Sequence, residues 1–106
     1  MKPVQDPILW TSDEVSKVIG IKIESSWLSN GIEFDSRKVE KGNIFFALSG
    51  NTLDGHNFIK DAVKLGAMAL IVNKTYKSNI YNNMLIKVDD VYKALLLMAN
   101  EARNRV

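Results

Sequence analysis

Three short apolar runs, separated by helical patterns, constrain the fold of this chain most strongly. IFFALS at 44–49 is bounded by Gly42 and Gly50, and AMALIV at 67–72 and MLIKV at 84–88 follow it. An apolar run of this length between turn residues is typical of a strand buried on both faces. Strands that alternate with helices pair in parallel in part of a sheet, and helices cover its faces. The runs predict an α/β fold, a three-layer α/β/α domain with a small mixed, partly parallel sheet of about five strands.

Three segments carry helical signals. Thr11 and Glu14 have the spacing of a capping box, which predicts a helix over about 12–19. The segment DGHNFIKDAVKLG at 54–66 places its apolar residues on one helical face. VDDVYKALLLMANEARNR at 88–105 repeats apolar residues from Val91 on at i, i+3, i+4, i+7, i+8 and i+11, the clearest helical period in the chain, and Asp89 or Asp90 can cap it.

The remaining segments are predicted from alternation and from proline. IKIE at 21–24 and GIEFD at 31–35 alternate apolar and polar residues, which predicts two further strands. The polar, asparagine-rich stretch at 73–83 predicts a loop. Two prolines block a helix in residues 1–10, so we expect an extended N-terminal leader there and a single domain over 11–106.

Composition excludes several classes of function. The chain has 106 residues and no cysteine, which excludes zinc clusters, disulfide frameworks and thiol nucleophiles. With one histidine, a histidine-based metal site would depend on carboxylates for its other ligands, and we expect no metal. Its 14 basic residues are spread along the chain, so we expect no nucleic-acid partner. The run at 67–72 is too short to span a bilayer, and no signal-peptide pattern begins the chain. A cytoplasmic protein without a membrane partner is the expectation.

One polar cluster, Asp35-Ser36-Arg37, lies where the strand predicted at 31–35 ends. Open α/β sheets bind ligands at such positions. A serine hydroxyl can donate a hydrogen bond to a phosphate oxygen, and an arginine can bind phosphate through two parallel bonds. Alternatively, Asp35 and Ser36 only form a turn and Arg37 is a solvated surface charge. The residues alone leave both interpretations open.

A second polar segment, GNTLDGH at 50–56, joins a predicted buried strand to a predicted helix. Backbone N–H groups at such a crossing can bind an anion or a nucleotide. The segment is neither a Walker A loop nor GxGxxG, since it lacks the Lys-Ser/Thr pair and the glycine spacing. Asp54 is equally explained as a helix N-cap, Gly55 as a requirement of chain geometry, and His56 as a packing or capping residue.

The order of these motifs resembles the N-terminal domain of the Mur ligases, which build the peptidoglycan stem peptide. The segments DSRKVEKGNIFFALSG, DGHNFI and AVKLGAMALIV match that family's patterns in order and spacing, and the resemblance covers about residues 10–106. The flanking segments LWTSDEVSKVIG and VDDVYKALLLMANEARNRV look more like the MurF branch, which adds D-alanyl-D-alanine, than the MurE branch, which adds the third residue.

The resemblance implies a set of contacts for the uridine diphosphate (UDP) part of a substrate. Carried over by position, the binding residues are Asp35, Ser36, Arg37, Gly50, Asn51, Thr52, Leu53 and Asp54. Ser36 would contact the diphosphate, and Asn51 and Thr52 would face the base. Gly55 and His56 would shape the loop, and no residue of this chain would be catalytic. The family often carries an acidic residue in place of Asn51 and an aromatic one in place of Leu53, so this chain departs from the pattern there.

The resemblance also implies a three-domain, ATP-dependent peptide-bond-forming ligase. The N-terminal domain would hold UDP-MurNAc-tripeptide, a central domain would bind ATP and Mg2+, and a C-terminal domain would receive D-alanyl-D-alanine, which attacks an acyl phosphate. No GxxGKT phosphate loop occurs in the chain. We therefore expect the first domain alone, a monomer that needs no cofactor and is inactive by itself. The alternatives are the same domain of MurE and a non-enzymatic α/β interaction module.

Overall fold

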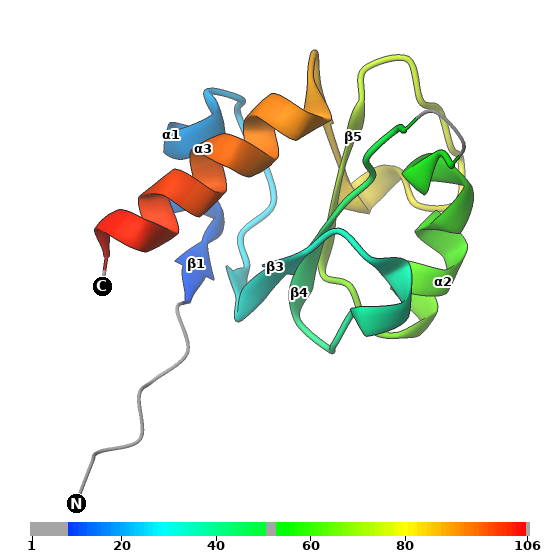
Figure 1. The fold of residues 1–106 in the computed structure, drawn as a ribbon, viewed down its shortest axis with the longest axis horizontal. Helices are drawn as coiled ribbons and strands as arrows, with labels where there is room; N and C mark the ends of the chain where they lie inside the picture. The colour runs from blue at the N-terminus through cyan, green and yellow to red at the C-terminus, as the bar shows by residue number, and fades with distance from the viewer. Residues whose placement is uncertain (1–8, 51–52, 106) are drawn as a thin grey trace, which may run out of the picture.

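A four-stranded parallel sheet forms the centre of the molecule (Figure 1). The structure is a computed structural model that describes residues 9–50 and 53–105. The strands lie in the order β3-β4-β5-β6, which is also their order along the chain. Their bounds are Gly31–Glu33 for β3, Asn43–Phe46 for β4, Ala69–Asn73 for β5 and Leu85–Val88 for β6. Because all four are parallel, their carboxyl ends lie at one edge of the sheet.

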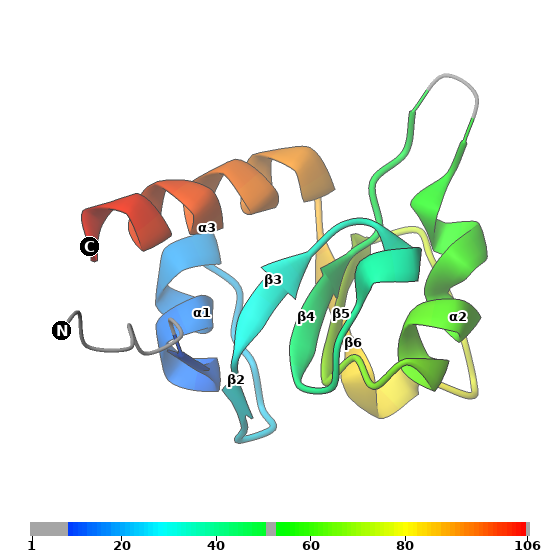
Figure 2. The same cartoon turned by 60° about the horizontal axis from the view of Figure 1, so that its bottom comes forward.

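Alternate side chains of the sheet enter two separate cores. Ile44, Phe46 and Ile71 belong to the core shared with α1 (Ser12–Ile19) and α3 (Val91–Asn104). Phe45 and Leu70, on the opposite face, pack in the core that includes α2 (Ile59–Lys64). The sheet therefore lies between α1 and α3 on one side and α2 on the other (Figure 2). The α/β fold class and its three layers are confirmed.

A second, antiparallel sheet pairs β1 (Trp10–Thr11) with β2 (Leu28–Ser29). The six strands of the described residues thus form two sheets, one parallel and one antiparallel. The strand predicted at 21–24 is wrong, since that segment pairs with no strand. Its apolar residues, Ile21 and Ile23, are half-buried against the core of α1 and α3, while Lys22 and Glu24 are exposed. The alternation there reflects one-sided burial of an irregular segment.

The predicted helix boundaries follow from side-chain capping. Thr11 and Glu14 form the capping box of α1: the Thr11 Oγ1 accepts from the Glu14 N–H, and Glu14 Oε1 accepts from the Thr11 N–H. Asp90 caps α3 by accepting from the Lys93 N–H at 3.0 Å. The helix predicted within 54–66 is divided into a 3-10 turn, η2 (Gly55–Phe58), and α2. No helix of the described residues has the length and apolarity needed to cross a bilayer.

The two ends of the described chain are joined through Arg105. Its guanidinium lies 3.9 Å from the centre of the Trp10 ring, and Trp10 is only 1% exposed. The same group donates to the Leu9 carbonyl at 2.8 Å and to Glu14 Oε2 at 2.6 Å. Hydrogen bonds from Thr11, more than the charge of Arg105, lower the pKa of the Glu14 carboxyl. The carboxyl end of α3 is thereby attached to β1 and α1.

Candidate functional site

A pocket of about 470 Å³ lies at the carboxyl ends of β3 and β4. Phe34 and residues 35–37, which follow β3, form one side of it. Leu48, Leu53 and Gly55, which follow β4, form the other side. The two polar segments of the sequence therefore meet in one pocket at the edge of the sheet where parallel strands end.

Asp35 and Arg37 form a local ion pair beside this pocket. Asp35 caps η1 (Ser36–Lys38): its Oδ1 accepts from the Arg37 N–H at 3.0 Å and from Arg37 Nε at 3.1 Å. Its Oδ2 accepts from Arg37 Nη2 at 3.0 Å. These bonds, chiefly the one from the Arg37 side chain, hold the pKa of the Asp35 carboxyl below its usual range. Asp35 therefore forms the turn that the sequence offered as one of two interpretations, and the guanidinium of Arg37 pairs with Asp35.

Ser36 lies between these two residues and is the buried member of the motif, with 9% of its surface exposed. It begins η1 and lines the pocket. Phe34 and Leu53 also line the pocket but are 57% and 66% exposed. The pocket therefore combines a hydroxyl residue with two large apolar side chains that solvent reaches.

The segment after β4 folds back on itself, and Gly55 lies at the close approach. The Gly55 N–H donates to the Leu48 carbonyl at 2.6 Å, and the Gly50 N–H donates to the Leu53 carbonyl at 2.7 Å. A Cβ atom on Gly55 would lie 2.7 Å from the backbone N and O of Leu48. Only glycine fits there without a shift of the backbone. The base of the loop is thus closely packed on its own strand.

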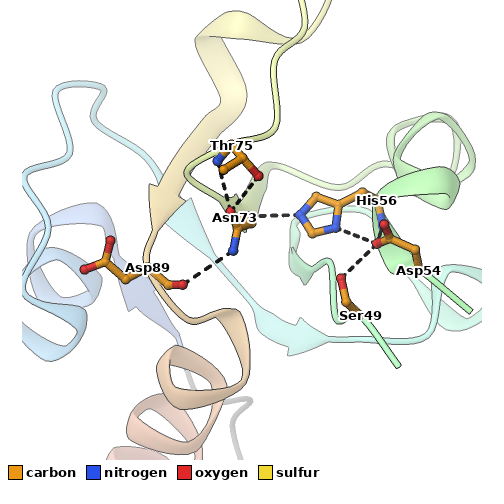
Figure 3. A network of polar contacts seen from close by, with 6 residues as sticks. All are labelled: Ser49, Asp54, His56, Asn73, Thr75 and Asp89. Atoms are coloured by element: carbon orange, nitrogen blue, oxygen red, sulfur yellow. Dashed lines mark hydrogen bonds and ion pairs between the residues drawn. The ribbon is translucent and has the colours of Figure 1, made fainter. Parts of the chain in front are cut away.

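A polar network fixes the same loop from the other side (Figure 3). Asp54 Oδ1 accepts from the Ser49 hydroxyl at 3.0 Å and from the His56 N–H at 3.0 Å, and it lies 2.7 Å from His56 Nδ1. These bonds, above all the one from the His56 backbone, lower the pKa of the Asp54 carboxyl. His56 Nε2 accepts from the Asn73 N–H at 2.9 Å. The loop is therefore attached to the end of β5.

The structure places the candidate residues in two groups. Those that line the pocket are Asp35, Ser36, Arg37, Leu53 and Gly55. Asp54 and His56 instead lie on the other side of the loop, where they line a second, more polar hollow of about 420 Å³ with Ser49, Asn73 and Tyr76. Gly50 lines neither pocket, and Asn51 and Thr52 lie outside the described residues.

Phe34 and Asn73 were not among the residues expected at the site. Phe34 precedes the Asp-Ser-Arg motif, and its position just beyond β3 is the signal that could have identified it. Asn73 is the last residue of β5, a polar residue directly after an apolar run. That position is where side chains of parallel strands reach a ligand edge.

Two other observations concern the choice of pocket and the absence of a metal-binding cluster among the described residues. A larger hollow, of about 620 Å³, lies between the segments 21–27 and 82–87, away from both polar motifs. The pocket of about 470 Å³ is the stronger candidate because it contains the buried Ser36 and the loop residue Gly55. Within residues 9–50 and 53–105, no three histidine or acidic side chains lie close enough together to hold a metal ion.

Comparison with known proteins places these features in a family context. Residues 28–103 match the family described as "Mur ligase family, catalytic domain". The chain is 39% identical over 92 residues to UDP-N-acetylmuramoyl-tripeptide–D-alanyl-D-alanine ligase of Rickettsia prowazekii, covering 87% of this chain and 20% of that enzyme. It is 35% identical over 88 residues to UDP-N-acetylmuramoyl-L-alanyl-D-glutamate–2,6-diaminopimelate ligase 2 of Clostridium acetobutylicum, covering 83% and 17%.

The solved structures agree with these sequence matches. A crystal structure of MurF from Acinetobacter baumannii superposes with a TM-score of 0.78 at 25% identity, covering 95% of this chain and 22% of that one. MurF from Thermotoga maritima, in complex with ADP, superposes with a TM-score of 0.57 at 30% identity, covering 66% and 16%. The chain spans about a fifth of the length of the curated relatives it matches.

Proposed function

The chain belongs to the Mur ligase family, and on that premise we propose that it is the substrate-binding domain of a MurF-type peptidoglycan-precursor ligase. Its role is to hold the UDP part of UDP-MurNAc-tripeptide while the full enzyme joins D-alanyl-D-alanine to the tripeptide. The observation that carries the proposal is the pocket of about 470 Å³ shared by residues 35–37 and the loop after β4. The match to a D-alanyl-D-alanine ligase, at 39% identity, covers 87% of the chain, whereas the diaminopimelate ligases that are 42% identical cover 67–73% of it, and this wider match supports the MurF assignment.

The proposed contacts follow from the chemistry of the pocket. The Ser36 hydroxyl donates to a diphosphate oxygen, and Asp35 positions the neighbouring Arg37, whose side chain is 86% exposed. Phe34 and Leu53 offer apolar surface to the flat uracil ring. Asn51 and Thr52 are the candidates for hydrogen bonds to the edge of the base. Gly50 and Asp54 are the candidates that complete the loop around the uridine.

ATP and Mg2+, which the family uses, do not fit the residues described. The sequence has no GxxGKT phosphate loop, and residues 9–50 and 53–105 contain no cluster of three metal-binding side chains. We therefore propose that both act in the rest of the full-length enzyme, and that this domain alone does not catalyse ligation. Its contribution is orientation: binding energy gained at the UDP part of a long substrate aligns a reacting carboxylate far away.

The corresponding domain of a MurE-type ligase is the second candidate. It is supported by 35% identity to the diaminopimelate ligase of Clostridium acetobutylicum and by 38% identity to that of Clostridioides difficile. The names of both kinds of enzyme give a UDP-N-acetylmuramoyl substrate. This domain would therefore bind the UDP group in the same way in either enzyme. Ligation assays on the full-length protein, with D-alanyl-D-alanine and with diaminopimelate as the incoming amine, separate the two.

Isothermal titration of this chain with UDP-MurNAc-tripeptide tests the binding proposal. We expect measurable binding, and we expect Ser36→Ala to weaken it about tenfold or more, since a hydrogen bond to a charged group is lost. Ser26→Ala is the matched control because Ser26 is exposed and lies outside the pocket. The thermal midpoint of Ser36→Ala should match that of the wild type. No heat at millimolar ligand, or equal affinity of both serine variants, would overturn the proposal.

A further inference from the structure

His56 joins the ends of two neighbouring strands through both of its ring nitrogens (Figure 3). Its side chain is only 10% exposed. On one side Nδ1 lies 2.7 Å from Asp54 Oδ1, in the segment after β4. On the other side Nε2 is 2.9 Å from the backbone nitrogen of Asn73, the last residue of β5.

These two contacts allow one protonation state of the ring. A backbone N–H can only donate, so Nε2 must accept from Asn73 with its lone pair. The single proton of a neutral imidazole then lies on Nδ1, where it is donated to the Asp54 carboxylate. A second proton on Nε2 would face the Asn73 N–H, remove that bond and leave the backbone donor without its partner. The neutral Nδ1–H form alone satisfies both neighbours.

The charged and titratable groups around the ring act unequally on its two nitrogens. Asp54 is the carboxylate at Nδ1, and its lowered pKa keeps it charged at neutral and mildly acidic pH. The ring of Tyr76 lies at 5.4 Å between centroids. Beyond Asn73, Lys74 and Asp89 form an exposed ion pair at 3.1 Å. Protonation of Nε2 would therefore keep the Asp54 contact and break the Asn73 contact.

The Asn73 contact is the one that attaches the loop to the sheet. Asp54 also accepts from Ser49, so hydrogen bonds to one carboxylate join Ser49 and His56 at the base of the loop. Asn73 is fixed in turn by the bonds of its side-chain oxygen to Thr75. The loop supplies Leu53 and Gly55 to the pocket, so the position of this wall depends on the bond between His56 and Asn73.

We propose that His56 is a positioning residue for the pocket, acting through Asn73, and that the pocket binds its nucleotide ligand tightly only while His56 Nε2 carries no proton. This inference rests on the proposed function, since it concerns the same pocket. It gives binding a dependence on pH that the ligand cannot supply, because a diphosphate esterified at both ends keeps its charge over the range in which histidines ordinarily titrate, about pH 8 to pH 5.

Two measurements on this chain test the inference. Nitrogen-15 NMR of the histidine ring at about pH 8, above the usual histidine range, should show the Nδ1–H tautomer. On acidification, the protection factors of the Asn73 and Gly55 amides, each taken relative to the intrinsic exchange rate at the same pH, should fall. The Nε2–H tautomer at about pH 8, or equal protection factors of these amides at about pH 8 and about pH 5, would overturn the inference without touching the proposed function.

Titration with UDP-MurNAc-tripeptide at the two ends of this range gives the functional readout. The wild type should bind about tenfold more weakly at about pH 5 than at about pH 8, the scale of one lost hydrogen bond. His56→Gln, whose side-chain oxygen can still accept from Asn73 and which does not titrate, should show no such change. Equal wild-type affinity at both pH values would overturn the inference alone. Absence of binding at both would overturn the proposed function and this role with it.

Discussion

Gly55→Ala inserts a methyl group where the backbone leaves no room for it. The new Cβ atom would lie 2.7 Å from both the N and the O of Leu48, and 3.0 Å from the carbonyl carbon of Ala47. These are backbone atoms, which cannot rotate away as a flexible side chain can. The hydrogen bond from the Gly55 N–H to the Leu48 carbonyl must therefore lengthen or break. Overpacking of this kind costs about 1–3 kcal/mol.

Urea unfolding measures this cost, with Gly50→Ala as the matched control. Within residues 9–50 and 53–105, a Cβ atom on Gly50 would meet only the Leu53 carbonyl, at an ordinary 3.5 Å. We expect Gly55→Ala to lose about 2 kcal/mol, which at an m value of about 1.5 kcal/mol/M lowers the midpoint by roughly 1.3 M. Gly50→Ala should stay within about 0.5 kcal/mol of the wild type. Equal stability of the two variants would refute the argument from close packing.

Two further stability predictions concern the ends of the chain and the loop. Arg105→Gln should lower the free energy of unfolding by about 1–3 kcal/mol, because the stacking on Trp10 and the bond to Glu14 are lost; the exposed Arg103→Gln should change it by less than about 0.5 kcal/mol in the same urea titration. Because the pKa of Asp54 is lowered in the folded protein, its ionised carboxyl contributes fully to the free energy of unfolding above the ordinary aspartate pKa of about 3.9. That contribution is lost as the pH falls through the lower pKa of the folded state. The stability of Asp54→Asn, measured from pH 6 down to pH 2, should therefore decline less than that of the wild type, and parallel profiles would contradict this assignment.

The first helix could be predicted from the sequence almost to the residue, whereas the cap at Asp54 begins a 3-10 turn ahead of α2. Thr11 and Glu14 form the expected capping box, and the long apolar period predicted α3. The ends of strands were harder to predict, because an apolar run indicates which residues are buried but not which residues pair with a neighbouring strand. The run at 44–49 stays buried through Ala47, while strand pairing ends at Phe46. The same reasoning explains the error at 21–24, where alternate residues pack against the core without a partner strand.

The candidate site could be predicted in outline because its two motifs follow neighbouring parallel strands. Residues 35–37 and the loop after β4 must then end at one edge of the sheet, as they do. The bond between His56 and Asn73 could not be foreseen, since it joins residues that are 17 positions apart in the sequence. No local pattern marks such a contact, because it depends on the register of β4 and β5.

The central claim, that the pocket between η1 and the loop after β4 binds the UDP part of the substrate, is tested most directly by NMR shift mapping. UDP-MurNAc-tripeptide is added to the labelled chain, and the backbone amide shifts are followed. We expect the amides of Ser36, Leu53 and Gly55 to shift together, and those of the hollow at 21–27 and 82–87 to stay unchanged. Shifts confined to that larger hollow, or none at millimolar ligand, would contradict it.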